Sequence, residues 1–211
     1  MDNLTHTLVG LALADSGLKR TTRFGTAVLV IGANLPDLDG FSYVLGSDTD
    51  ALAFRRGWTH GVLAMVLLPL LLTAVVLAWN RMVARRRRDA AAIPVHSRWL
   101  LALATVAIWS HPLLDLLNTY GVRLLMPFSG RWFYGDALFI VDPWVWAVLT
   151  LGVVASRRGS RRVIWARLAL AVSLAYAGAM AASSRMGRGF VEARSGTPGL
   201  RTMVVPGTGA R

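Results

Sequence analysis

Long apolar stretches separated by short charged segments run through the chain. Residues 61–79 contain no charged side chain. At about 1.5 Å per residue, such a helix is roughly 28 Å long, close to the thickness of a hydrocarbon core of about 30 Å. The pattern predicts an all-α, polytopic transmembrane bundle with five or six membrane helices. The expected elements are residues 4–14, 24–45, 61–79, 99–117, 137–155 and 163–182.

The two ends of the chain differ in character. Residues 1–185 contain all the apolar elements, and we expect them to form one membrane-embedded domain. Residues 186–211 are rich in Gly, Arg, Ser and Pro and show no apolar period, which predicts a disordered C-terminal tail.

Composition excludes other classes of protein. Of 211 residues, 55 % are apolar and 16 % charged, whereas a soluble domain has about 25 % charged residues. The 23 Lys and Arg against 11 Asp and Glu give a net charge of +12, which in a soluble protein would indicate a nucleic-acid partner. Here the basic residues lie between apolar segments, so the positive-inside bias explains them better, and we expect no direct nucleic-acid binding.

The loop charges predict an orientation. Residues 17–23, 80–98 and 156–162 contain three, six and four basic residues, thirteen together, whereas residues 47–58 and 119–136 contain two each, four together. The richer side should be cytoplasmic. We therefore expect a multi-pass protein of the cell inner membrane, with membrane lipids around it and both termini outside the cytoplasm.

Several ionisable residues interrupt the apolar elements. Asp37 and Asp39 lie in the second element, and His111 and Asp115 in the fourth. An Asp at the centre of a membrane helix raises the free energy of insertion by roughly 2.5–3.5 kcal/mol. His6 lies in the first element and His60 opens the third. In the predicted orientation all six lie in the outer half of the bilayer or at its edge, which predicts one shared polar site.

The residue types and spacings indicate a metal. His111 and Asp115 are four residues apart, so on a helix they share one face. On a regular helix Asp37 and Asp39 would point to nearly opposite sides. Pro36 and Gly40, which flank them, predict an unwound segment from which both carboxylates can face one cavity. Without cysteine, a His and Asp set suits Zn²⁺, Mn²⁺ or Fe²⁺ better than Ca²⁺.

Each of these residues also has a simpler interpretation. His60 can be an interfacial or capping residue, and His111 beside Pro112 can satisfy a freed carbonyl. Asp142 is better explained as the N-cap of a helix that begins at Pro143. His96 lies in a basic loop and should be solvated.

The motifs resemble the YdjM-like family of bacterial inner-membrane proteins, which are described as metal-dependent hydrolases and also as LexA-binding. The resemblance covers residues 1–185 and rests on residues 1–10 (MDNLTHTLVG), 34–39 (NLPDLD), 56–60 (RGWTH), 111–115 (HPLLD), 118–121 (NTYG), and the run from 127 to 144. It implies a divalent metal, Zn²⁺ first, held by His6, Asp37, His60, His111 and Asp115. Asp39 would lie behind these ligands or add another.

This resemblance implies a hydrolase. Metal-activated water would attack an ester or phosphoester at the extracytoplasmic side. The position of the polar residues in the outer half of the bilayer favours a lipid or lipid-linked substrate over a cytosolic metabolite. Asp39 would be the general base, or Asp37 if it is not a ligand. Arg55, Arg56 and Arg131 could hold an anionic head group, although interfacial anchoring explains them equally well.

Two other functions stay open at the level of sequence. Intramembrane Asp and His residues also mark proteins that bind or transport a metal ion or a proton without catalysis. The cytoplasmic halves of the third, fourth and fifth elements contain no ionisable residue, however, which favours a one-sided site and hence an enzyme or a sensor. A regulatory membrane anchor would use the basic loop at residues 81–98.

Overall fold

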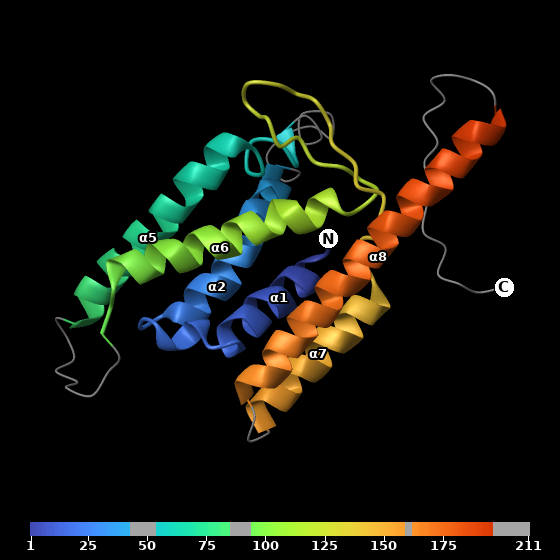
Figure 1. Ribbon diagram of the computed structural model, residues 1–211. Helices are drawn as coiled ribbons and strands as arrows, with labels where there is room; N and C mark the ends of the chain where they lie inside the picture. The colour runs from blue at the N-terminus through green and yellow to red at the C-terminus, as the bar shows by residue number, and fades with distance from the viewer. Residues whose placement is uncertain (43–53, 85–93, 159–161, 196–211) are drawn as a thin grey trace.

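The computed structural model describes residues 1–42, 54–84, 94–158 and 162–195, and all regular secondary structure in them is helical (Figure 1). The α-helices are α1 (Asn3–Asp15), α2 (Gly25–Asn34), α5 (Val62–Ala84), α6 (Ser97–Leu116), α7 (Pro143–Arg158) and α8 (Arg162–Ser195). Two 3₁₀ segments, η1 (Leu18–Arg20) and η2 (Leu35–Phe41), precede and follow α2. The prediction of an all-α bundle is confirmed.

Within the described residues, three helices are long and apolar enough to cross a membrane. The candidate spans are Val62–Val83 in α5, Ser97–Leu116 in α6 and Arg162–Arg194 in α8. The helices α1, α2 and α7 have 13, 10 and 16 residues, so they rise about 20, 15 and 24 Å. They are shorter than a hydrocarbon core, and the expected count of five or six spans stays a prediction.

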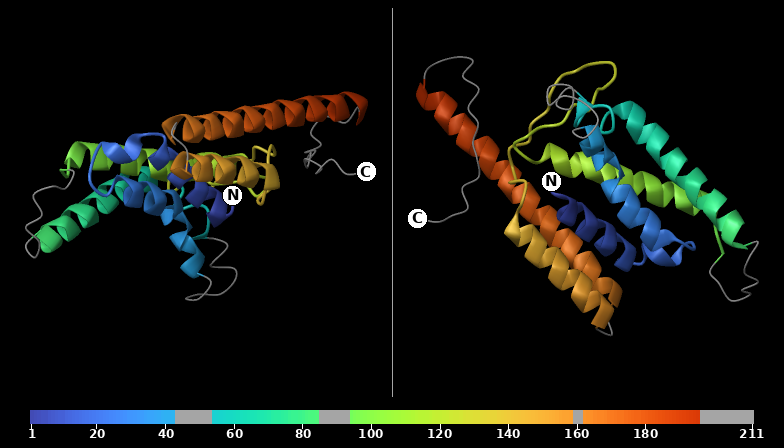
Figure 2. Two further views of the ribbon diagram at one scale, coloured as in Figure 1. Left: turned by 90° about the horizontal axis from the view of Figure 1, so that it is seen from below. Right: turned by 180° about the vertical axis from the view of Figure 1, so that it is seen from behind.

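The α1 helix lies in the middle of the bundle (Figures 1 and 2). It packs against α2, α7 and α8, while α2 continues the contact to α6 and α6 to α5. One buried apolar core joins α1 to α7 and α8 through Leu8, Ala12, Leu149, Val153 and Ala169. A second core joins α2, α5 and α6 through Val28, Leu29, Leu72, Leu103, Ala107 and Ile108.

Two glycines allow the central helices to approach closely. A Cβ on Gly10 of α1 would lie 2.8 Å from the carbonyl oxygen of Leu29 on α2. A Cβ on Gly32 of α2 would lie 2.8 Å from the Cβ of Ala107 on α6. Small residues at helix contacts are typical of membrane bundles, and here they bring α1, α2 and α6 together.

The outer surfaces of α5 and α8 are apolar and exposed. Leu67, Leu71 and Val75 on α5 and Leu174 on α8 each expose half or more of their surface. A contiguous apolar surface of this kind indicates a membrane or protein contact. With the apolar spans, it indicates helices that face lipid.

The connections gather at two opposite ends of the bundle (Figure 1). One end carries η1, the beginning of α6, the end of α7 and the beginning of α8, which border the loops predicted to be cytoplasmic. The other end carries η2, residues 54–61 and the connection from 118 to 142.

The ends of two helices test finer predictions. Asp142 Oδ1 accepts hydrogen bonds from the N–H groups of Trp144 and Val145 at 3.0 and 3.1 Å, so its predicted role as the N-cap of α7 is confirmed. The α8 helix continues to Ser195. Residues 186–195, predicted as the start of a disordered tail, are therefore helical, and the rest of that tail lies outside the described residues.

Candidate metal centre

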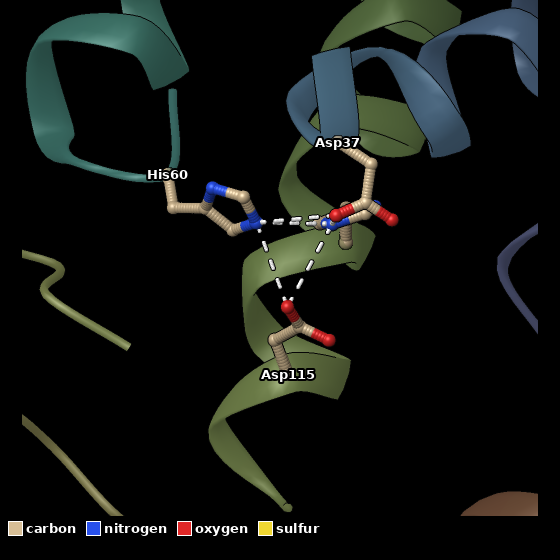
Figure 3. Close-up of side chains that lie close together, drawn as sticks. Asp37, His60 and Asp115 are labelled. Carbon is tan, nitrogen blue, oxygen red and sulfur yellow. Dashed lines mark hydrogen bonds and ion pairs between the residues drawn. The ribbon is translucent and has the colours of Figure 1, made fainter. Parts of the chain in front are cut away.

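Four side chains that are far apart in the sequence converge where α2 ends and α6 nears its own end. Asp37 comes from η2, His60 from the turn before α5, and His111 and Asp115 from α6. One ligand atom from each lies within 4.8 Å of the corresponding atom of every other. Figure 3 shows Asp37, His60 and Asp115 pointing toward one another. We call these four residues the His–Asp cluster.

The distances within the His–Asp cluster match a metal coordination shell. Ligand atoms about 2.1 Å from a tetrahedral Zn²⁺ lie about 3.4 Å from one another. His60 Nε2 is 3.1 Å from His111 Nε2, 3.5 Å from Asp115 Oδ2 and 3.9 Å from Asp37 Oδ1. His111 Nε2 is 3.5 Å from Asp37 Oδ1 and 3.8 Å from Asp115 Oδ2. The set of two imidazoles and two carboxylates fits Zn²⁺, Mn²⁺ or Fe²⁺.

The backbone fixes the orientation of His111. Its Nδ1 lies 2.7 Å from the carbonyl oxygen of Ala33 at the end of α2. Because a carbonyl oxygen only accepts hydrogen bonds, Nδ1 carries a hydrogen, and Nε2 is the nitrogen that can offer a lone pair to a metal. That lone pair points into the His–Asp cluster, as a metal ligand requires.

Asp39 and Thr59 orient His60 in the same way. The Thr59 hydroxyl donates to Asp39 Oδ2 at 2.9 Å and lies 2.9 Å from His60 Nδ1, while Asp39 Oδ2 is 3.4 Å from that same nitrogen. The Asp39 carboxylate can only accept, and the Thr59 hydroxyl already donates its hydrogen to Asp39. His60 Nδ1 is therefore the donor toward both of them. His60 therefore also presents a lone pair at Nε2.

Asp39 thus lies behind His60, whereas Asp37 belongs to the His–Asp cluster. The two carboxylates do not face the same atoms, because side chains two apart in a 3₁₀ helix point about 120° away from each other. The Arg56 N–H and the Thr59 hydroxyl donate hydrogen bonds to Asp39 Oδ2 at 2.7 and 2.9 Å, and His60 Nδ1 lies 3.4 Å from the same oxygen. Asp39 therefore positions His60.

His6 borders the cluster without belonging to its closest set. Its ring stacks on His111, with the centroids 3.7 Å apart and the planes 17° from parallel. Its Nε2 lies 3.4 Å from Asp115 Oδ1. The structure therefore brings together all five residues expected as ligands, four in one group and His6 beside it.

A scan of family models matches residues 1–185 to the YdjM inner membrane protein family. The chain belongs to this family. The match covers the whole His–Asp cluster, and together with the apolar helices it makes the protein an inner-membrane protein, as the sequence predicted.

One curated relative is similar over a shorter length. The uncharacterized protein YfhP of Bacillus subtilis (strain 168) is 26 % identical over 155 residues, which are 69 % of this chain and 43 % of YfhP. The chain thus matches less than half of that relative's length. No solved structure matches this YdjM family member.

The three arginines expected to bind substrate lie in different surroundings. The Arg56 guanidinium donates to Asn118 Oδ1 at 3.3 Å and to the Gly121 carbonyl at 3.1 Å, and it lies 3.6 Å from Asp115 Oδ2. The carbonyl of Arg55 accepts from a neighbouring guanidinium. Arg131 is exposed and stacks over a phenylalanine ring in the 118–142 connection. Of the three, Arg56 reaches the His–Asp cluster of this YdjM family member.

Two groups that orient the imidazoles of the cluster were not predicted from the sequence, the Thr59 hydroxyl and the Ala33 carbonyl. A third, the buried Asn118, accepts a hydrogen bond from the Arg56 guanidinium through Oδ1. Thr59 directly precedes His60 in the RGWTH motif, which is a usable signal in the sequence, and Asn118 belongs to the NTYG motif. A backbone carbonyl carries no signal in the sequence. His96 is exposed, as expected for a solvated loop residue.

Proposed function

We propose that this protein is a membrane-bound, metal-dependent hydrolase that acts on a lipid or lipid-linked ester or phosphoester at the extracytoplasmic face. The YdjM family match and the His–Asp cluster support the membrane metal site on which the proposal builds. When bound, a divalent metal, Zn²⁺ first, would lower the pKa of a coordinated water and polarise the scissile oxygen.

The facing imidazoles carry this proposal. His60 and His111 each direct Nδ1 at a hydrogen-bond acceptor, so Nε2 is the nitrogen whose lone pair each ring can offer to a metal, and the two Nε2 atoms lie 3.1 Å apart. Two lone pairs at that distance repel unless a cation lies against them. A shared proton would interact with the two nitrogens only, whereas a divalent metal would also bind the carboxylates of Asp37 and Asp115.

The remaining residues have distinct tasks in the proposed reaction. Asp39 and Thr59 position His60, and the Ala33 carbonyl positions His111. Arg56 lies beside Asp115 with 12 % of its side chain exposed, so it could pair with an anionic group on the substrate. The exposed apolar residues Leu38 and Phe41 lie on η2 next to Asp37, which favours a substrate with an apolar portion.

A non-catalytic metal or proton transporter is the alternative. A transporter needs polar groups through both halves of the bilayer. Along α1, the residues between His6 and Asp15 are Thr7 followed by apolar residues only, from Leu8 to Ala14. This favours a one-sided site over a conduction path.

Metal content and hydrolysis, measured on the same preparation, test the proposal. Detergent-purified wild type, His60→Ala and His96→Ala would be analysed by mass spectrometry, with His96→Ala as the control because that histidine is exposed. Each would then be assayed on mixed micelles that carry a fluorogenic lipid phosphoester or lipid carboxylate ester, with and without chelator. We expect bound metal and chelator-sensitive hydrolysis in the wild type and in His96→Ala, and neither in His60→Ala.

Two results would count against this function. A folded wild type without metal would remove its chemical basis. A metal-loaded protein that hydrolyses neither substrate class, but moves metal ions into liposomes that contain an indicator dye, would favour the transporter.

A further inference from the structure

His6 on α1 is buried without a side-chain hydrogen-bond partner. Its side chain has no exposed surface, and no side chain of the described residues makes a hydrogen bond to either ring nitrogen, although Nε2 lies 3.4 Å from Asp115 Oδ1. A buried polar group without a hydrogen bond lowers the stability of the fold by about 1–3 kcal/mol. Its presence in a folded protein therefore needs an explanation. The arrangement around Asp115 supplies one.

The two oxygens of Asp115 face different histidines. Oδ2 lies 3.5 Å from His60 Nε2 and 3.8 Å from His111 Nε2, whereas Oδ1 lies 3.4 Å from His6 Nε2. No side chain of the described residues donates a hydrogen bond to either oxygen, and the Met1 nitrogen contacts Oδ1. One carboxylate therefore presents one oxygen to each of two groups of imidazoles, which is the geometry of a bridging ligand.

We propose that the centre holds two divalent metal ions bridged by Asp115, one in the His–Asp cluster and the second between His6 Nε2 and Asp115 Oδ1. This inference rests on the proposed function and specifies its metal centre. Metal pairs in hydrolytic sites lie about 3.5–4 Å apart. The rings of His6 and His111 stack at 3.7 Å, so ions held in the planes of the two rings have a matching separation.

The second site has few protein ligands. Within the described residues, the side chains that carry it are His6 and Asp115, so water or substrate oxygens complete its coordination. The Met1 nitrogen also contacts Asp115 Oδ1, and as an ammonium group it would satisfy that oxygen in place of a second ion. A count of bound ions separates these two arrangements.

The test compares wild type with His6→Phe, His6→Gln and His96→Ala. The His6→Phe variant keeps an aromatic ring stacked on His111 but removes the ligand nitrogen, and His6→Gln covers the case in which the larger ring prevents folding. Each protein would be equilibrated with Mn²⁺ in detergent and freed of excess metal. Bound ions per chain would be counted by mass spectrometry, and electron paramagnetic resonance would report coupling between ions. Circular dichroism and gel filtration would check the fold.

We expect about two coupled Mn²⁺ per wild-type or His96→Ala chain and about one uncoupled Mn²⁺ per His6 variant. A single ion in the wild type would overturn the inference and leave the proposed function standing, with the Met1 nitrogen as the partner of Oδ1. Two ions in folded His6 variants, or none, would also overturn it. No metal in the wild type would refute both proposals.

Discussion

Replacing Asp39 with asparagine distinguishes a positioning residue from a ligand and from a general base. Asp39 Oδ2 accepts from the Arg56 N–H at 2.7 Å and from the Thr59 hydroxyl at 2.9 Å, and it faces His60 Nδ1 at 3.4 Å. An amide oxygen in the place of Oδ2 keeps both hydrogen bonds. The new amide nitrogen takes the place of Oδ1, which has no hydrogen-bond partner in the described residues. The fold should therefore survive, and the main loss is the negative charge behind His60.

The expected size of the effect follows from that position. Residues that orient a ligating histidine typically change metal affinity 10- to 100-fold, or about 1.4–2.7 kcal/mol. We therefore expect Asp39→Asn to bind Zn²⁺ about 10- to 100-fold more weakly than wild type. His60→Ala, which removes a ligand atom, should lose far more.

Competition with a chromophoric chelator in detergent measures these affinities. Asp142→Asn is the matched control, because it neutralises another buried carboxylate, one that caps α7, and asparagine is an equally good N-cap. If Asp39→Asn binds Zn²⁺ as tightly as wild type but no longer hydrolyses substrate, Asp39 acts as a general base, and the positioning role is refuted. Affinity as low as in His60→Ala would show that Asp39 is itself a ligand.

Three further predictions concern packing, capping and metal linkage. Gly32→Ala places a Cβ 2.8 Å from that of Ala107, so it should lower the free energy of unfolding by about 1–3 kcal/mol and lower the metal content. Gly178→Ala, with open space around its Cβ, should change neither. Equal melting temperatures for the two variants would contradict this prediction. Asp142→Ala should lower the free energy of unfolding by about 1 kcal/mol and leave the metal content unchanged. Loss of metal in this variant would show that the start of α7 supports the metal site. Zn²⁺ at 100 times its Kd should stabilise wild type by about 2.7 kcal/mol in thermal scanning, and a similar shift in His60→Ala would place the metal elsewhere.

Much of the fold could be predicted because the relevant signals are local. Long apolar runs determine which segments form membrane helices, since burying charge in hydrocarbon is costly. The Asp142–Pro143 pair predicts a helix start from the chemistry of two residues, and the structure has it. The end of α8 could not be predicted this way, because the sequence after residue 183 has no apolar period that would indicate a helix.

The sequence by itself determined that the chain is a membrane protein and which costly polar residues it carries. It also placed His111 and Asp115 on one helix face, because residues four apart on an α-helix are neighbours. The tertiary structure alone decided that Asp37 joins these two while Asp39 lies behind His60. That choice depends on the 3₁₀ geometry of η2 and on the close packing of α2 against α6. Contacts between distant segments come from helix packing, which no local pattern encodes.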